Sequence, residues 1–140
     1  MMIAQNFYKQ IISNIPILCV DVIVKNENKN YLLLSRKNEP LKNQWWVIGG
    51  RVFLGQTIEE SCRRKVIEEA NLKINDLKFV GYYEDCFDTN AFEKKIYHTI
   101  SLVFETNISK VYVEKNIKLN ADHTSWKWFN HLPKRLIIQN

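Results

Sequence analysis

Apolar residues recur at two different spacings along the first part of the chain. Between residues 7 and 15 they repeat at the helical period, and we predict a short helix there. This helix should end before Pro16, because the residue before a proline avoids the helical region. Residues 17–25 and 31–34 then form two apolar runs with polar residues between them, a pattern that predicts a β-hairpin.

The middle of the chain continues with a short aromatic run at residues 45–48, which predicts another strand. Gly49 and Gly50 follow it, and we expect the strand to stop there at a backbone turn that other residues cannot adopt. The other predicted elements are strands at residues 79–83, 96–104 and 126–129, and a final helix that begins near Pro133.

Residues 57–70 carry a helical pattern. Thr57 is predicted as the N-cap, with Glu59 and Glu60 in the first turn, where carboxylates suit the positive end of the helix dipole. At about 100° per residue, one face of the helix is apolar and should pack on the sheet. The residues of this face are Ile58, Cys62, Val66 and Ala70.

Two charged residues, Glu69 and Lys65, fall inside that apolar face. With Ile58 as the origin, Glu69 lies about 20° to one side and Lys65 about 20° to the other. A carboxylate buried without a partner costs several kcal/mol, so Glu69 must meet a cation. Two partners are open: Lys65, four residues earlier, or a bound hard cation such as Mg²⁺.

Strands mixed with about three helices predict an α+β fold, an α/β/α sandwich with a mixed β-sheet. The 140 residues, 46% of them hydrophobic, suit one domain over residues 1–140. A net charge of +5 favours anionic partners only mildly, and we expect no nucleic acid. The three cysteines have no CxxC spacing, which fits a reducing cytoplasm. The longest apolar stretch, residues 15–24, is interrupted by Asp21, so no membrane association is expected.

The segment Gly50 to Leu72, GRVFLGQTIEESCRRKVIEEANL, resembles a Nudix box, GX5EX7REUXEEXGU. Three positions depart from the box: Gln56 and Lys65 replace glutamates, and Asn71 replaces a glycine. In many Nudix pyrophosphohydrolases the glutamate replaced by Lys65 takes part in metal binding or base chemistry. Its loss argues against ordinary attack on phosphorus. The positions that match are Arg64, Val66, Glu68, Glu69 and Leu72.

Such a degenerate box is similar to that of the GDP-mannose mannosyl hydrolases. The resemblance implies a Nudix fold and Mg²⁺-dependent hydrolysis of GDP-mannose or a similar GDP-sugar, in which water attacks the anomeric carbon with inversion and GDP leaves. It also implies a homodimer and a role in polysaccharide biosynthesis. The segments that carry it outside the box are PILCVDVIV (residues 16–24), SRKNEP (35–40), WWVIGGRV (45–52) and DHTSWKW (122–128).

The metal site implied by the resemblance uses the Glu69 carboxylate and the main-chain carbonyl of Gly50. Asp122 stands where the family supplies a further side-chain oxygen. Glu68 is a further candidate ligand, and a pair with Arg64 four residues earlier is an equal alternative.

His123 is the candidate general base, because an imidazole of near-neutral pKa beside a metal ligand can take a proton from water. The alternative for a loop histidine is a surface position.

Arg51 and Arg36 are the candidate ligands of the diphosphate, and Arg51 is also assigned a catalytic part because it would stabilise charge on the leaving group. An unpaired carboxylate at Asp21, inside an apolar strand, would cost free energy, so we expect Asp21 to have a function there. The resemblance implies that Asp21 faces the sugar as a catalytic and binding residue, and a salt bridge inside the fold is the alternative. Asp85 stands where the family has a His and is expected to contact the sugar.

Two other functions stay open from the sequence. One is a Nudix pyrophosphohydrolase that attacks phosphorus in a nucleoside diphosphate derivative. The other is a non-catalytic module that binds a nucleotide sugar, which the three substitutions in the box would suit.

Overall fold

The computed structural model describes residues 3–88, 92 and 95–140. Helix α1 covers Gln5–Asn14 and gives way to extended backbone before Pro16, as predicted. Strands β1 (Ile17–Lys25) and β2 (Tyr31–Arg36) follow as an antiparallel hairpin, with Lys25 opposite Tyr31. The first part of the chain therefore folds as its hydrophobic pattern indicates.

Seven strands form one mixed sheet in the order β3-β2-β1-β6-β5, with β4 paired to β1 and β7 to β2. Strands β1 and β6 run parallel, while the other pairs are antiparallel. This arrangement confirms the predicted α+β fold with a mixed sheet. The later strands are β3 (Trp45–Trp46), β4 (Ile48–Arg51), β5 (Lys78–Phe87), β6 (Tyr97–Asn107) and β7 (His123–Phe129).

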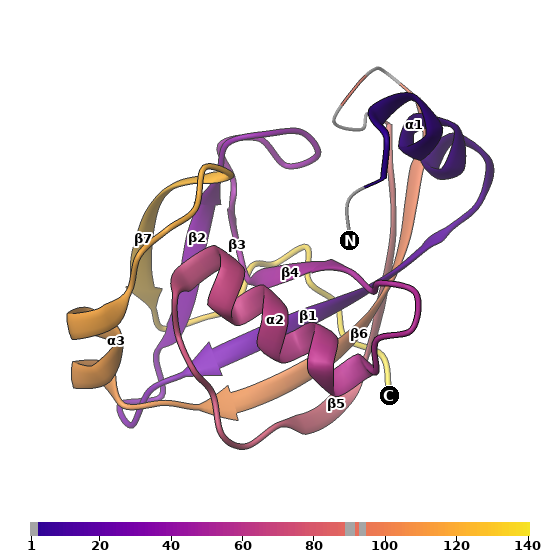
Figure 1. Cartoon of the computed structure of the whole chain (residues 1–140). Coiled ribbons are helices and arrows are strands. Elements are labelled where there is room, and N and C mark those ends of the chain that lie inside the picture. The colour runs from indigo at the N-terminus through magenta and orange to yellow at the C-terminus, as the bar shows by residue number, and fades with distance from the viewer. Residues whose placement is uncertain (1–2, 89–91, 93–94) are drawn as a thin grey trace.

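Strand β1 changes partner along its length. Its end at Lys25 pairs with β2, whereas its first half, from Cys19 to Val22, pairs with β4. Figure 1 shows β1 and β2 spreading apart from their shared corner, with β4 and helix α2 beside β1. The early part of β1 is thereby placed next to the glycines of β4 and the inner face of α2, where the candidate site forms.

Helix α2 covers Ile58–Ala70 and begins at a capping box. The Thr57 hydroxyl accepts a hydrogen bond from the Glu60 N–H at 3.1 Å, and the Glu60 carboxylate accepts one from the Thr57 N–H at 3.0 Å. These two bonds satisfy backbone donors that the first helical turn leaves without partners. At the other end Asn71 adopts the left-handed conformation and ends the helix. The predicted N-cap is confirmed.

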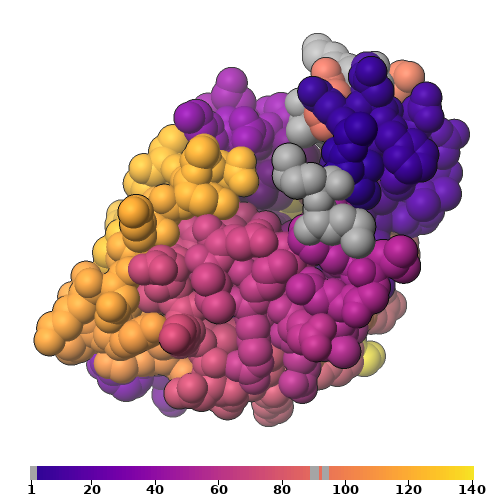
Figure 2. Space-filling model, in the orientation of Figure 1, coloured from indigo at the N-terminus to yellow at the C-terminus, as the bar shows by residue number. Residues whose placement is uncertain are grey.

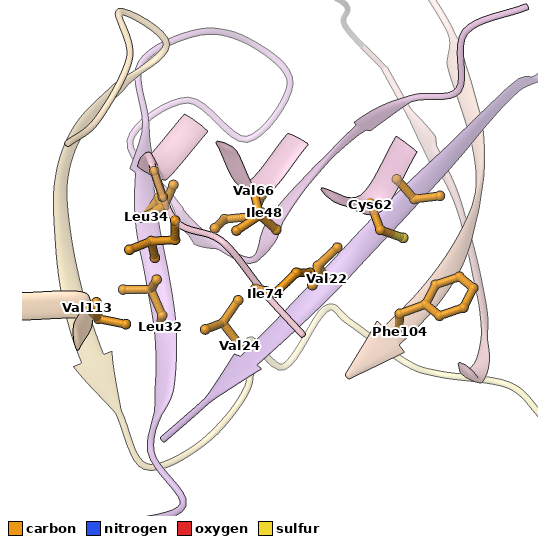
Figure 3. Packing of buried hydrophobic residues seen from close by; sticks show 13 residues of the cluster. Val22, Val24, Leu32, Leu34, Ile48, Cys62, Val66, Ile74, Phe104 and Val113 are labelled. Atoms are coloured by element: carbon orange, nitrogen blue, oxygen red, sulfur yellow. The ribbon is translucent and has the colours of Figure 1, made fainter. Parts of the chain in front are cut away.

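The main core lies between α2 and the sheet. Figure 3 shows Val66 of α2 beside Ile48 of β4, with Val22 and Val24 of β1 in the same cluster. Ile23, between those two valines, packs in a second cluster. Because alternate residues of β1 are buried in different clusters, its sequence is a nearly continuous apolar run. Each fully buried aliphatic side chain contributes about 1.5–3 kcal/mol, so this core holds α2 firmly in place.

The prediction that a strand stops at a turn at Gly49 and Gly50 is wrong. Both glycines lie inside β4, and neither has a positive φ. They are needed for close approach: a Cβ on Gly49 would lie 2.1 Å from Asp21 Oδ1, and one on Gly50 would lie 2.5 Å from Lys65 Cε. The strand is interrupted at Val47 instead: residues 45–46 pair with β2, and residues 48–51 pair with β1.

The third helix lies elsewhere than predicted. Helix α3 covers Lys110–Asn116, where Ser109 accepts a hydrogen bond from the Tyr112 N–H and caps the first turn. No helix begins near Pro133 in the described chain; Gln139 instead pairs with Tyr82 of β5 through two hydrogen bonds of 2.7 Å. This pairing holds the end of the chain against β5.

The outer surface of the molecule is formed on one side by α2. Figure 2 shows this side, with α2 in magenta between α3 in orange and α1 in indigo, which projects at one corner. Among the residues that the structure describes, no helix has both the length and the apolar character needed to cross a membrane.

Candidate active site

A cavity of about 290 Å³ lies where α1, the loop after β2, β4, α2 and β6 meet. In Figure 1 the loop after β2 and helix α1 stand on either side of β4. The cavity is lined by the cations Arg36, Arg51 and Lys65, and by carboxylates that include Asp21 and Glu69. A cavity that combines several cations with buried carboxylates suits a ligand that has both anionic groups and hydroxyls.

Glu69 lies inside the fold, as its place on the apolar face of α2 predicts, and its residue is 5% exposed. One carboxylate oxygen accepts a hydrogen bond from the Gly49 N–H at 3.3 Å. The other lies 3.4 Å from Lys65 Nζ and 4.0 Å from His123 Nε2. Burial raises the pKa of Glu69 above its ordinary value, although the Lys65 charge acts in the opposite direction.

Lys65 is the cation that meets Glu69 in this structure. Its ammonium also lies 3.6 Å from Glu68 Oε2, so it sits between the two carboxylates. Its side chain is 14% exposed and passes over Gly50, where any Cβ would clash with it. Of the two partners that the sequence left open for Glu69, the structure shows the lysine.

The remaining predicted metal ligands are spread around this corner. Glu68 is 44% exposed and accepts two hydrogen bonds from Arg64, at 3.1 and 3.2 Å. This is the Arg64 pair that the sequence offered as the alternative to metal binding. Asp122 lines the cavity but is exposed and accepts a hydrogen bond of 3.4 Å from Asn38. Within the described part of the chain, no three His, Cys, Asp or Glu side chains are grouped so that they could hold a metal ion.

A divalent metal ion therefore does not fit the Glu69 corner as the structure has it. The ammonium of Lys65 already neutralises the carboxylate that would be the main ligand. An ion placed between Glu68 and Glu69 would lie against this positive charge and be repelled. The metal site predicted from sequence stays a prediction; its ligands are Glu69, Glu68, Gly50 and Asp122.

His123 is buried at the start of β7, and its imidazole is held in one orientation. Asn120 Oδ1 accepts a hydrogen bond from the Asp122 N–H at 3.1 Å, so this atom is the amide oxygen. It also lies 3.2 Å from His123 Nδ1, which must donate. The hydrogen is then on Nδ1, and Nε2, the nitrogen on the side of Glu69, is left free to accept a proton.

The environment of His123 keeps the imidazole neutral. Burial, together with the positive charge of Arg36, lowers its pKa to about 4. The side chain does not line the cavity; Glu69, 4.0 Å away, does. The predicted base therefore lies behind Glu69, and the two groups form what we call the Glu69–His123 pair. Asn120 was missed from the sequence, although an Asn two residues before Asp122 is a common signal for a local turn.

Asp21 lies on the floor of the cavity, in the middle of the sheet, and is 5% exposed. Burial raises its pKa to about 7, while a hydrogen bond from the Ser101 hydroxyl acts in the opposite direction. Thr99 and Ser101 of β6 are also buried and line the same floor. Ser101 was missed from the sequence, because only the parallel pairing of β1 with β6 brings it to Asp21.

The two predicted diphosphate ligands both line the cavity. Arg36 is fixed by a hydrogen bond of 2.7 Å from its Nε to the Pro40 carbonyl oxygen. The guanidinium of Arg51 lies 5.2 Å from the centre of the Tyr8 ring and 4.5 Å from that of Phe53. The structure thus brings Arg36, Arg51 and Asp21 to one cavity.

Asp85 is placed differently from the other candidates. It does not line the cavity; both of its carboxylate oxygens are hydrogen bonded to Arg135, one of them at 2.7 Å, and the Tyr83 hydroxyl also donates to it. Burial alone would raise the pKa of Asp85, but the Arg135 bonds hold it below its ordinary value. The sugar contact expected of Asp85 remains a prediction from sequence.

Comparison with known proteins gives the same architecture and a family. The family model of the NUDIX domain matches residues 16–132. The low-salt glycan biosynthesis protein Agl8 of Haloferax volcanii is 28% identical over 123 residues, covering 87% of this chain and 76% of its own length. The ADP-ribose pyrophosphatase of Methanocaldococcus jannaschii is 31% identical over 121 residues, covering 85% of this chain and 66% of its own.

Two solved structures show the likeness of fold. The MutT protein from Methanosarcina mazei has a TM-score of 0.67 at 22% identity, covering 83% of this chain and 78% of its own. The MutT NUDIX hydrolase from Burkholderia pseudomallei has a TM-score of 0.69 at 19% identity, covering 89% and 92%. Identities this low support the shared architecture alone.

Proposed function

The chain belongs to the NUDIX domain family, and from this premise we propose that it hydrolyses a nucleotide sugar, GDP-mannose or a similar GDP-sugar. In this reaction water attacks the anomeric carbon of the sugar, the bond from that carbon to the diphosphate oxygen breaks, and GDP leaves with the bonding electrons. The coarser assignment, a hydrolase of the NUDIX superfamily, rests on the family itself.

The observation that carries the proposal is that one cavity is lined both by cations and by buried polar groups. Arg36 and Arg51 offer fixed paired donors that match the oxygens of a diphosphate. Asp21 and Ser101 offer a buried acceptor and a hydroxyl, which suit sugar hydroxyl groups. A nucleotide sugar carries a diphosphate and a hydroxylated ring side by side, and so suits both kinds of group.

Attack on carbon rather than on phosphorus is favoured by Lys65. A glutamate at this position in the box takes part in metal binding or base chemistry in many pyrophosphohydrolases, and a lysine can do neither at neutral pH. A relative named for glycan biosynthesis, Agl8, supports a substrate that contains a sugar.

The mechanism uses the residues of the cavity in three parts. Asp21 holds the sugar through its hydroxyls, and Arg36 and Arg51 bind the diphosphate. The attacking water gives its proton to the Glu69 carboxylate, which faces the cavity, and His123 Nε2, 4.0 Å from that carboxylate, is the next acceptor. Negative charge grows on the diphosphate as the carbon–oxygen bond breaks, so the two arginines stabilise the transition state more than the ground state.

Magnesium is the cofactor predicted from sequence, and Nudix hydrolases generally use divalent metal ions. We assign it no step, because the Glu69 corner does not fit a divalent ion beside Lys65. The homodimer and the cytoplasmic location also remain predictions that rest on resemblance and cysteine usage.

The bond that is cleaved can be identified directly. GDP-mannose is incubated with the protein in ¹⁸O-water, and the products are analysed by mass spectrometry. We expect the label in free mannose and unlabelled GDP. Formation of GMP and mannose phosphate would contradict the proposal and assign the protein to attack on phosphorus.

The role of the Glu69–His123 pair is tested with His123→Ala. Loss of a general base lowers kcat by roughly two orders of magnitude, and we expect a loss of that size with little change in KM. Unchanged turnover would remove His123 from the mechanism. If no nucleotide sugar is turned over by the wild-type protein although one of them binds, the non-catalytic module is the correct interpretation.

A second candidate function is hydrolysis of a nucleoside diphosphate derivative at phosphorus. The ADP-ribose pyrophosphatase relative, at 31% identity, favours it. ADP-ribose as substrate, with AMP and ribose phosphate as products, distinguishes this function from the first in the same assay.

A further inference from the structure

The ammonium of Lys65 lies between two carboxylates of helix α2, a position that suits a cation. It lies 3.4 Å from one box carboxylate, Glu69, and 3.6 Å from the other, Glu68. Glu69 is buried, and its second oxygen is taken by the Gly49 N–H. The ammonium is thus the cation that pairs with the buried Glu69 carboxylate.

The backbone of β4 is shaped to admit this lysine. A Cβ on Gly50 would lie 2.5 Å from Lys65 Cε and 3.0 Å from both Cδ and Nζ. Only a glycine leaves room for the end of the side chain, which reaches the cavity between β4 and α2. The lysine is therefore packed into the site and lines the cavity together with Arg36 and Arg51.

The charges of this corner are balanced without a metal ion. Glu68 pairs with Arg64 and with Lys65, and Glu69 pairs with Lys65, so two carboxylates face two cations. A divalent ion between the same carboxylates would add two positive charges next to an ammonium that has little room to withdraw, because its side chain is 14% exposed.

We propose that the ammonium of Lys65 replaces the divalent metal ion of the NUDIX site and contacts the diphosphate of the substrate directly. The diphosphate contact rests on the proposed function; the replacement of the metal ion does not. Arg36, Arg51 and Lys65 line the same cavity, so a leaving nucleoside diphosphate would meet three cationic donors, one of which, Lys65, also pairs with Glu68 and Glu69. The free protein then holds no tightly bound divalent ion.

Binding of Mn²⁺ alone tests the replacement without any substrate. The signal of free Mn²⁺ in electron paramagnetic resonance is measured for the wild-type chain, Lys65→Glu, Lys65→Met and Lys73→Glu. Lys73, exposed just beyond the end of α2, gives the matched control for the change of charge. We expect no saturable binding below roughly 1 mM for wild type and Lys73→Glu, and at least about tenfold tighter binding for Lys65→Glu.

Lys65→Met keeps the aliphatic stem and removes only the charge, so it decides the question if Lys65→Glu does not fold. It should bind Mn²⁺ more tightly than the wild type does. Micromolar binding of Mn²⁺ to the wild-type chain, left unchanged by Lys65→Met, would overturn the proposal. So would equal tightening by Lys65→Glu and Lys73→Glu, since that would reflect overall charge.

Binding of GDP in the presence of EDTA tests the contact to the diphosphate. Calorimetry should show binding to the wild-type chain and about tenfold weaker binding to Lys65→Met. Equal affinity of the two proteins would overturn this contact. Absence of GDP binding to the wild-type chain would instead contradict the proposed function, while the Mn²⁺ titration would still decide whether Lys65 replaces the metal ion.

Discussion

Two carboxylates of the sheet, Asp21 and Asp85, were both expected to face a sugar, and the fold treats them in opposite ways. Asp85, on β5, has its own guanidinium: Arg135 binds both of its oxygens, and its pKa falls below the ordinary value in spite of burial. Asp21, in the middle of β1, is buried with a hydrogen bond from Ser101, and its pKa rises to about 7. The carboxylate of Asp85 is stabilised by its hydrogen bonds to Arg135, whereas burial destabilises the ionised form of Asp21.

The difference indicates which carboxylate is available to a ligand. A group already saturated by Arg135 has few lone pairs left for substrate hydroxyls. A group that is poorly satisfied in the free protein gains most when a ligand donates hydrogen bonds to it. The poorly satisfied group is the one that lines the cavity, Asp21.

The largest effect is expected on the stability of the protein, and it comes from the burial of Asp21. Because the folded-state pKa of Asp21 is raised to about 7, the protein should lose stability as the pH rises from the ordinary carboxyl range through 7. Asp21→Asn removes this loss. We expect it to stabilise the fold by about 3 kcal/mol at pH 8 and by much less at pH 4. Urea denaturation at both pH values measures the change, and a destabilised variant at pH 8 would contradict it.

Asp21→Asn should lose activity although it gains stability. An amide keeps the shape of the side chain but accepts fewer hydrogen bonds from the sugar, so kcat/KM should fall by roughly 100-fold, about 2.7 kcal/mol. The same assay on Asp85→Asn should show a change below about threefold. If Asp85→Asn loses as much activity as Asp21→Asn, the contrast between the two groups fails and the sugar contact predicted for Asp85 is correct.

Asp85, in contrast to Asp21, should stabilise the fold at neutral pH. Asp85→Asn removes the charge that pairs with Arg135, whose side chain is 47% exposed, so the loss should be about 1 kcal/mol at pH 7. Because the folded-state pKa of Asp85 is lowered, this contribution should disappear as the pH falls below the ordinary carboxyl range. Thermal unfolding at pH 7 and pH 3 measures it; an equal loss at both values would show a cause other than charge.

The smallest effect is expected for Arg135→Lys. A lysine keeps the charge but cannot donate the paired hydrogen bonds that Arg135 makes to Asp85, so stability should fall by about 0.5 kcal/mol. Chemical denaturation compares this variant with Lys134→Arg, the neighbouring exchange of cations, which should be neutral. Equal stability of Arg135→Lys and the wild-type protein would show that the charge alone supports Asp85.

The structure follows the sequence most closely where the decisive interactions are local. The capping box of Thr57 and Glu60 and the period of 3.6 residues located α2 and put Glu69 on its inner face. Both signals operate within a few residues, so no knowledge of the rest of the fold was needed. The short helix before Pro16 was found for the same reason.

The sequence was a poor guide where partners come from distant parts of the chain. Ser101 reaches Asp21 only through the parallel register of β1 and β6, and Arg135 reaches Asp85 across fifty residues. The terminal helix expected near Pro133 does not form, and Gln139 instead pairs with Tyr82 at the edge of the sheet. Local propensity contains no information on these pairings.

That Glu69 and Lys65 share the buried face of one helix could be inferred from the sequence alone, because the geometry of the α-helix fixes which residues lie together. The sequence could not decide whether Glu69 meets the lysine or a metal ion. In the folded chain the end of Lys65 lies beside Glu69, because Gly50 of β4 has no Cβ and leaves room for it. This placement depends on packing between elements, which a local pattern does not specify.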